Sequence, residues 1–178
     1  MPAVEAAEAP VSSPEAAELL NSLRIFRHVG LAVSGGGDSM ALMWLAARWV
    51  EETQQPPRLT VLTVDHGLRP GSGVEARWVV EQAQQAGFAA RVLEWRGDKP
   101  ETGVQARSRD ARYELMMRWC CEHGATALVT AHSLDDQAET FLMRLARGSG
   151  VDGLAGMRAV REDAVAILRP LLGVTRAR

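Results

Sequence analysis

The sequence contains almost no lysine. Lys99 is the only one among 178 residues, so the other basic residues in a total of 20 are arginines. This excludes a Walker A phosphate loop, which needs a lysine directly before its Ser or Thr. A basic excess is also missing, because the formal net charge is −2, whereas dedicated nucleic-acid modules are strongly basic. Any RNA binding must therefore be local or supplied by another part of the protein.

Cysteine and long apolar runs are scarce as well. Cys120 and Cys121 are adjacent in a predicted helix, an arrangement that suits neither a disulfide nor a metal site, so we interpret them as core residues in a reduced compartment. No apolar run reaches the roughly 18 to 20 residues that span a bilayer. Residues 1–18 lack the positive start and apolar centre of a signal peptide. These absences predict a cytoplasmic protein with no membrane partner.

Apolar runs and amphipathic runs alternate along the chain, which predicts an α/β fold. The expected strands are 29–33, 59–64, 89–93, 127–130 and 165–168, and the expected helices are 15–23, 39–53, 73–86, 104–122 and 134–147. Strands separated by long helices form parallel sheets through right-handed crossovers. We therefore expect an open, parallel five-stranded sheet with helices on both faces. Residues 1–22 should form a mobile tail and a short helix, and residues 23–178 one domain.

A glycine-rich loop lies between the first predicted strand and the next helix. It consists of Ser34, Gly35, Gly36, Gly37, Asp38 and Ser39. Glycine lets backbone N–H groups approach an anion closely, and amides at a helix N-terminus favour negative charge. Asp38 would repel phosphate unless a cation lay between them, which indicates magnesium. The alternative is a tight turn with a serine cap, but three successive glycines exceed what a turn requires.

Polar segments also follow the second and fourth predicted strands. Asp65 and His66 come after the second strand, and Asp135 and Asp136 come after the fourth. Since the carboxyl ends of parallel strands meet at one edge of a sheet, these residues and the glycine loop should line a common crevice. Asp65 and His66 are expected nucleotide-binding residues. The alternative for this segment is a turn closed by glycine and proline.

Acidic residues cluster at the start of the fourth long helix, where Asp135 and Asp136 are followed by Glu139. With Asp38 opposite, they predict a magnesium site, which we assign to Asp38 and Asp136. One acid could instead deprotonate an attacking amine, or all could merely complement the helix dipole. A stripe of apolar residues on the same helix is expected to be core, namely Ala138, Phe141, Leu142 and Leu145.

Arg109 and Arg112 lie three residues apart and share one face of the third long helix. That face suits contact with phosphates of ATP or RNA. Solvated ion pairs with residues such as Glu114 are the alternative.

Six segments occur together in the order and spacing of one known family. They are SGGGDS at 34–39, VDHGLRP at 64–70, ARY at 111–113, AHSLDDQAET at 131–140, RGSGVDGLAGM at 147–157 and RPLL at 169–172. The first is similar to the PP-loop of the ATP pyrophosphatase superfamily, and the whole set resembles the tRNA(Ile)-lysidine synthetases. The resemblance implies an adenine nucleotide alpha hydrolase-like, Rossmann-like fold. Ser133 departs from it, because the family usually has a second histidine there.

The resemblance also implies a two-step reaction with ATP and Mg²⁺. The wobble cytidine of tRNA(Ile) with a CAU anticodon is adenylated, pyrophosphate leaves, and free L-lysine displaces AMP to give lysidine. Gly35, Gly36, Gly37 and Ser39 would hold pyrophosphate, with Ser34 beside them. Catalytic roles would fall to Asp38, Asp135, Asp136, Arg109 and Arg112. Family members continue beyond RPLL, so we expect a catalytic domain truncated at its C-terminus.

Two alternatives and one open question accompany this prediction. A tRNA-thiolating PP-loop enzyme would generally need paired catalytic cysteines or a cluster-binding motif, and a catalytically silent nucleotide-binding module would not need the two adjacent aspartates. Whether the chain forms a homodimer is left open by the sequence.

Overall fold

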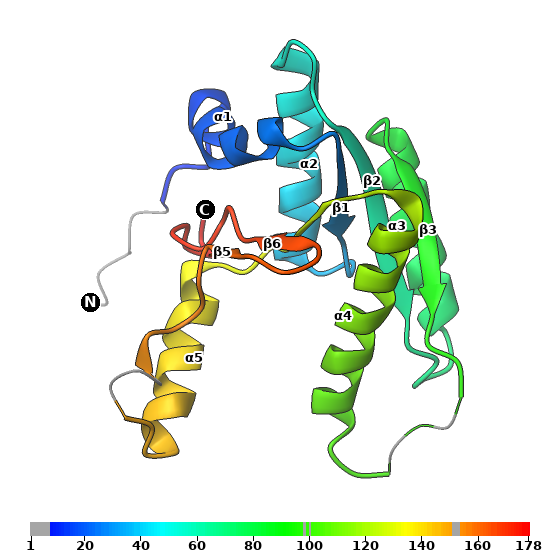
Figure 1. The fold of residues 1–178 in the computed structure, drawn as a ribbon, viewed down its shortest axis with the longest axis vertical. Coiled ribbons are helices and arrows are strands. Elements are labelled where there is room, and N and C mark those ends of the chain that lie inside the picture. The colour runs from blue at the N-terminus through cyan, green and yellow to red at the C-terminus, as the bar shows by residue number, and fades with distance from the viewer. Residues whose placement is uncertain (1–7, 98, 100, 151–153) are drawn as a thin grey trace, which may run out of the picture.

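The structure is a computed structural model that describes residues 8–97, 99, 101–150 and 154–178 (Figure 1). Its helices are α1 (Ser13–Leu20), α2 (Gly37–Glu52), α3 (Ser72–Gln85), α4 (Val104–His123) and α5 (Leu134–Ala146), with a 3₁₀ turn η1 (Asn21–Ile25) after α1. Its strands are β1 (His28–Ala32), β2 (Arg58–Asp65), β3 (Ala89–Glu94), β4 (Ala127–Val129), β5 (Val160–Arg161) and β6 (Ala166–Leu168). The expected alternation of strands and helices is confirmed.

The strands form one sheet in the order β3-β2-β1-β4-β6-β5. All five predicted strands are present and pair in parallel. A sixth strand, β5, was not predicted, and it pairs antiparallel with β6 through Val160 and Leu168. Two exposed residues carry no alternation of apolar and polar positions, so no sequence pattern marks this strand.

The direction of the connections reverses at β1. The chain proceeds from β1 to β2 and β3 on one side, and then returns to place β4 on the other side of β1. In open parallel sheets, ligands bind at such a switch point, outside the carboxyl ends of the strands. The loops that follow β1 and β4 therefore flank the expected crevice.

Helices cover both faces of the sheet, as predicted. Strand β2 shows the division, because Val61 packs into the cluster that contains Leu42 of α2, whereas the next residue, Leu62, packs against Met116 and Cys120 of α4. Successive strand side chains point to opposite faces, so one strand contributes to both cores. Helices α1, α2 and α3 supply the first cluster, and α4 supplies the second.

Helix α1 packs on α2, and Leu20 and Leu23 belong to the larger core cluster. The proposed boundary between a short helical tail and the domain at residue 23 stays a prediction. Residues 1–7 of the expected mobile tail lie outside the described residues.

The prediction that the apolar stripe of α5 is core is wrong. None of the residues of α5 is buried, and Phe141, Leu142 and Leu145 are 42%, 61% and 52% exposed. The helix extends away from the sheet (Figure 1). Amphipathic spacing shows which side of a helix is apolar, but it does not show that another element covers that side.

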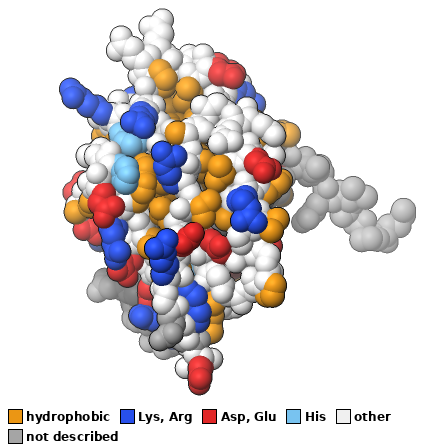
Figure 2. Space-filling model, turned by 90° about the vertical axis from the view of Figure 1, so that its right-hand side faces the viewer, with side chains coloured by type: hydrophobic (Ala, Val, Ile, Leu, Met, Phe, Trp, Pro, Cys, Tyr) orange, Lys and Arg blue, Asp and Glu red, His pale blue; other side chains and the backbone are white. Residues whose placement is uncertain are grey.

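The face that carries α3 and β3 has basic and acidic side chains interspersed (Figure 2). On it, Glu94 at the end of the edge strand pairs with Arg96 at 3.0 Å. Charged side chains on an edge strand discourage pairing with other chains. This face offers no continuous basic surface. Within the described residues, no helix is both long and apolar enough to cross a membrane.

The two leucines Leu42 and Leu142 give a matched test of this packing. Both are helical, but the first is fully buried and the second is 61% exposed. We expect Leu42→Ala to lower the free energy of unfolding by about 2–5 kcal/mol, because it removes methyl groups from the core. Leu142→Ala should change it by no more than about 0.5 kcal/mol. Urea unfolding followed by circular dichroism measures both, and equal losses would contradict the exposure of α5.

Candidate functional site: a phosphate cradle facing an acid cluster

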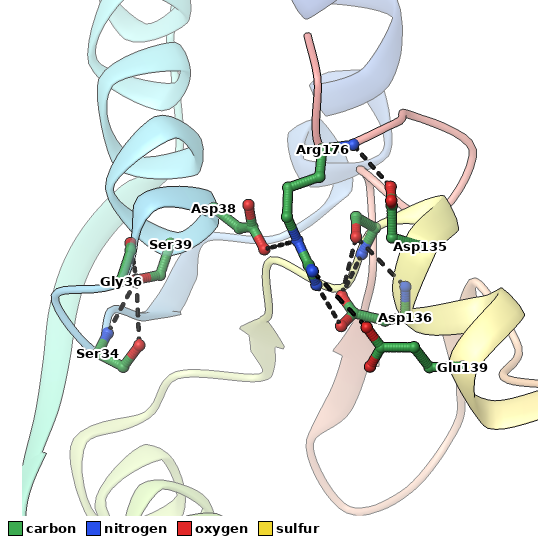
Figure 3. Close-up of polar contacts among 9 residues, drawn as sticks. Ser34, Gly36, Asp38, Ser39, Asp135, Asp136, Glu139 and Arg176 are labelled. Carbon is green, nitrogen blue, oxygen red and sulfur yellow. Dashed lines mark hydrogen bonds and ion pairs between the residues drawn. The ribbon is translucent and has the colours of Figure 1, made fainter. Parts of the chain in front are cut away.

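The glycine loop turns the chain from β1 into α2. Gly35 has a φ of +84°, which L residues with a side chain rarely adopt, and a Cβ there would lie 3.2 Å from Cγ2 of Val79. The Ser39 hydroxyl donates to the Gly36 carbonyl at 2.9 Å and accepts from the Ser34 amide at 3.1 Å (Figure 3). These bonds hold the loop closed. The first amides of α2 have no intrahelical acceptors, so they can bind an anion.

A cleft of about 600 Å³ opens beside this loop, a size that suits a nucleotide. Nine of the predicted site residues line it, namely Ser34, Gly36, Gly37, Asp38, Ser39, His66, Arg109, Arg112 and Asp136. They come from β1, β2, α2, α4 and α5 or the loops that follow. The predicted convergence at one edge of the sheet is therefore present.

Three predicted residues do not line the cleft: Gly35, Asp65 and Asp135. The Asp65 carboxylate accepts from the Ser72 hydroxyl at 2.6 Å and from the Gly67 amide at 2.9 Å. The bond from Ser72, then that from Gly67, lowers the pKa of Asp65. Asp65 thus stabilises the turn into α3, and its predicted contact with nucleotide stays a prediction.

Helix α5 begins with a reciprocal cap. The Ser133 hydroxyl accepts from the Asp136 amide at 3.4 Å, and Oδ2 of Asp136 accepts from the Ser133 amide at 2.7 Å. Burial acts to raise the pKa of Asp136, but bonds from Ser133 and the nearby cations outweigh it and lower the pKa. Asp136 is therefore a carboxylate facing the cleft. The serine at the position where the family usually has histidine has a structural role here.

Sequence reasoning missed Arg176, which bridges two of the acids beside the cleft. Arg176 places Nε 3.1 Å from Oδ2 of Asp38 and Nη2 3.0 Å from Oδ1 of Asp136, and its amide donates to Asp135 at 2.7 Å (Figure 3). Nη1 also lies 3.7 Å from Glu139. Its position could have been inferred, because it follows β6, which is parallel to β4 and ends at the same edge of the sheet.

The Arg176 guanidinium lies between the two carboxylates to which the magnesium ion was assigned from the sequence. It shows that Asp38 and Asp136 can share one cation. In the part of the chain that the structure describes, no three His, Cys, Asp or Glu side chains are grouped closely enough to hold a metal alone. Magnesium is usually bound by one or two carboxylates together with substrate phosphates and water, so the two aspartates fit that mode.

On the α4 side, Arg109 and His132 form a pair. Nη2 of Arg109 lies 3.4 Å from Nε2 of His132, and Nδ1 of His132 lies 2.8 Å from the Thr130 hydroxyl. Burial, followed by the positive charges of Arg109 and Arg169, lowers the pKa of His132 to about 4. The imidazole is therefore neutral near pH 7, and its Nε2 accepts from Arg109.

The alternative interpretation of the arginines as partners of Glu114 is wrong. Glu114 pairs with Arg118 at 2.7 Å instead. Among the described residues, neither Arg109 nor Arg112 has a carboxylate partner, and both line the cleft. Burial, with Arg109 nearby, lowers the pKa of Arg112. Two guanidinium groups that face a cleft without counterions favour an anionic ligand.

The fold and the site together define an α/β protein with a cleft at the switch point of a parallel sheet, and the lining of this cleft suits a phosphate-bearing ligand. Comparison with known sequences is consistent with this class. The PP-loop domain matches residues 10–178, and the chain belongs to this family.

Individual proteins that are similar to this chain include two curated enzymes and one solved structure. The tRNA(Ile)-lysidine synthase of Bradyrhizobium diazoefficiens is 52% identical over 169 residues, which cover 94% of this chain and 47% of the relative. That of Rhodopseudomonas palustris is also 52% identical and is covered over 49% of its length. The chain thus spans about half the length of these relatives. The U34-tRNA thiolase NcsA from Methanococcus maripaludis has a TM-score of 0.77 at 18% identity, covering 92% of this chain and 59% of the thiolase, which shows the fold alone.

The pair of Arg109 and His132 can be tested by titration. We expect Arg109→Gln to raise the pKa of His132 from about 4 toward its ordinary value, because a positive charge beside the imidazole is removed. Arg107→Gln, two residues earlier on α4, does not change the cleft lining and should leave the value unchanged. NMR of the imidazole signals measures both.

The lowered pKa of His132 also predicts that the stability of the folded chain depends on pH. Because the pKa of His132 is lower in the folded chain, its contribution to stability is intact above about pH 6.5 and is lost as the pH falls toward 4. The loss should be smaller in the Arg109→Gln variant. If the His132 imidazole of the wild-type chain titrates near pH 6.5, its assignment as a neutral group with a lowered pKa is wrong.

Proposed function

We propose that this chain is the ATP-binding catalytic part of a tRNA(Ile)-lysidine synthetase. It would join free L-lysine to C2 of the wobble cytidine of tRNA(Ile) with a CAU anticodon, and release AMP and pyrophosphate. One observation carries the proposal: the glycine loop and Asp136 of α5 face the same cleft from opposite sides of the switch point. Similarity to lysidine synthases at 52% identity supports the choice of substrate class.

The loop suits a nucleotide that is attacked at its α-phosphate. The first amides of α2 and the Ser39 hydroxyl would hold the β and γ phosphates, which leave together as pyrophosphate. No lysine reaches the loop from the position that a Walker A sequence would use, since Asp38 occupies it. The β and γ phosphates, which would leave as pyrophosphate, would thus be bound by backbone amides and a hydroxyl and not by a lysine side chain.

Asp38 and Asp136 would hold Mg²⁺ together with the phosphates. The ion would neutralise charge on the phosphate oxygens and so relieve their repulsion from Asp38. Arg109 and Arg112, on the other side of the cleft, would stabilise the negative charge that develops when the cytidine O2 attacks the α-phosphate. They could also contact the tRNA backbone.

In the second step the ε-amine of lysine displaces AMP. The acid cluster of α5 and Asp38 suits an ammonium group, because it presents several carboxylates to one position. One of these acids, Asp135 or Asp136, would take the proton that the amine loses on attack. His132 is not assigned this role, because its Nε2 already faces Arg109 at 3.4 Å and its Nδ1 is bound to the Thr130 hydroxyl at 2.8 Å.

Sulfur transfer is the second candidate, and the cysteines disfavour it. Cys120 is buried in the second core cluster, where burial and then Cys121 raise the pKa of its thiol to about 12. Cys121 is exposed, and neither cysteine lines the cleft. A catalytic sulfur carrier needs an accessible thiolate. A silent nucleotide-binding module is disfavoured by the carboxylates that face the phosphate cradle.

A single-turnover assay tests the proposal. The chain is held in excess over a CAU-anticodon transcript, so that weak tRNA binding does not limit the reaction, and is incubated with ATP, Mg²⁺ and radiolabelled lysine. We expect lysine to be incorporated into the RNA. Asp38→Asn should lower the rate by about 100-fold, because it removes a charged group at the phosphates. Asp110→Asn, on the exposed face of α4, should retain the wild-type rate.

The alternatives give distinct results in the same assay. Modification of the RNA that requires a sulfur donor instead of lysine would indicate a thiolating enzyme. ATP binding without tRNA-dependent release of AMP would indicate a silent module.

A further inference from the structure

We propose that Arg176 is the resident counterion of the acid cluster and competes with the cation that binds there. The identity of that cation, Mg²⁺ or the ammonium group of lysine, rests on the proposed function. The competition itself does not, because it follows from the contacts of the guanidinium.

One guanidinium bridges two separate elements. Nε binds Asp38 of α2 at 3.1 Å, and Nη2 binds Asp136 of α5 at 3.0 Å, while Nη1 lies 3.7 Å from Glu139 (Figure 3). Of these, Asp38 and Asp136 are the carboxylates that face the cleft from opposite sides of the switch point. A cation that binds Asp38 and Asp136 must therefore replace the guanidinium at the same oxygens.

The backbone beside Arg176 is fixed. Leu171 and Val174 are buried in the larger core cluster, and the Val174 carbonyl accepts from the Leu134 amide at 2.8 Å. The Arg176 amide is itself bound to Asp135 at 2.7 Å. The side chain is thus delivered to the acids by a packed segment and not by a loose end.

The side chain itself is free to leave. It is 46% exposed, and ion pairs between exposed groups are weak. Arg176 also lines a neighbouring cavity of about 290 Å³, together with Trp44 and Val174. The guanidinium can swing toward this space or toward water without disturbing the core. Three carboxylates face one guanidinium, so the cluster keeps an excess of negative charge that attracts a second cation.

The test is direct titration of the chain with cations, without tRNA or ATP. Mn²⁺, followed by water-proton relaxation, replaces Mg²⁺, and L-lysine is compared by calorimetry with L-norleucine, which lacks the ammonium group. If the guanidinium occupies the acids most of the time, Arg176→Gln should tighten cation binding roughly three- to tenfold. Arg176→Lys keeps the charge and should remain within about twofold of wild type.

Arg178→Gln is the matched control. It removes the same charge two residues away, where the guanidinium pairs with Glu15 at 2.6 Å, and it should leave cation affinity unchanged. A gain for Mn²⁺ alone would assign Arg176 to the metal, and a gain for lysine alone to the ammonium group. The proposal is overturned if Arg176→Gln binds both ligands no more tightly than wild type does, or if Arg178→Gln shows an equal gain. Neither result depends on lysidine formation, so failure here and failure of the proposed function are distinguishable.

Discussion

The site depends on the parallel pairing of β1 with β2 on one side and β4 on the other. This pairing fixes where the chain leaves each strand, and therefore where the loops after β1 and β4 meet. The register aligns Leu31 of β1 with Val129 of β4, so the glycine loop and the cap of α5 follow within a few residues of the same row. A parallel sheet needs long crossovers, and these place helices on both faces, which shield the strands and leave the carboxyl edge open.

The second constraint is charge. Phosphate oxygens and carboxylates repel each other, yet the cleft brings the anion cradle of α2 and Asp136 of α5 together. Arg176 pairs with Asp38 and Asp136, while Arg109 and Arg112 face the cleft from α4 without carboxylate partners in the described residues. The cleft thus has a cationic wall and an acidic wall. Such a division suits a reaction in which a polyanion and a cationic nucleophile must both approach one base.

Most of the fold was predictable, because five strands and four long helices carry strong periodic patterns. The site was predictable to the extent that sheet topology determines it. His66, the two arginines, Asp136 and the glycine loop apart from Gly35 line one cleft, and their roles there stay predictions. Three features were missed from the sequence, for physical reasons. Strand β5 has two residues and no pattern. The exposure of α5 depends on what packs against it. The role of Arg176 depends on tertiary contacts across 138 residues, which no local spacing records.

The absence of lysine from the glycine loop connects the sequence to the chemistry. A lysine at the outer phosphates would also hold the pyrophosphate product, which gains negative charge on leaving, and it would then slow the departure of that product. Amides at a helix N-terminus bind the same oxygens through dipoles and not through a full charge. Asp38, at the position of that lysine, adds repulsion that is relieved only while a cation lies between carboxylate and phosphate. Under the proposed function, the loop would therefore bind pyrophosphate firmly with its cation and weakly without it, which would favour turnover.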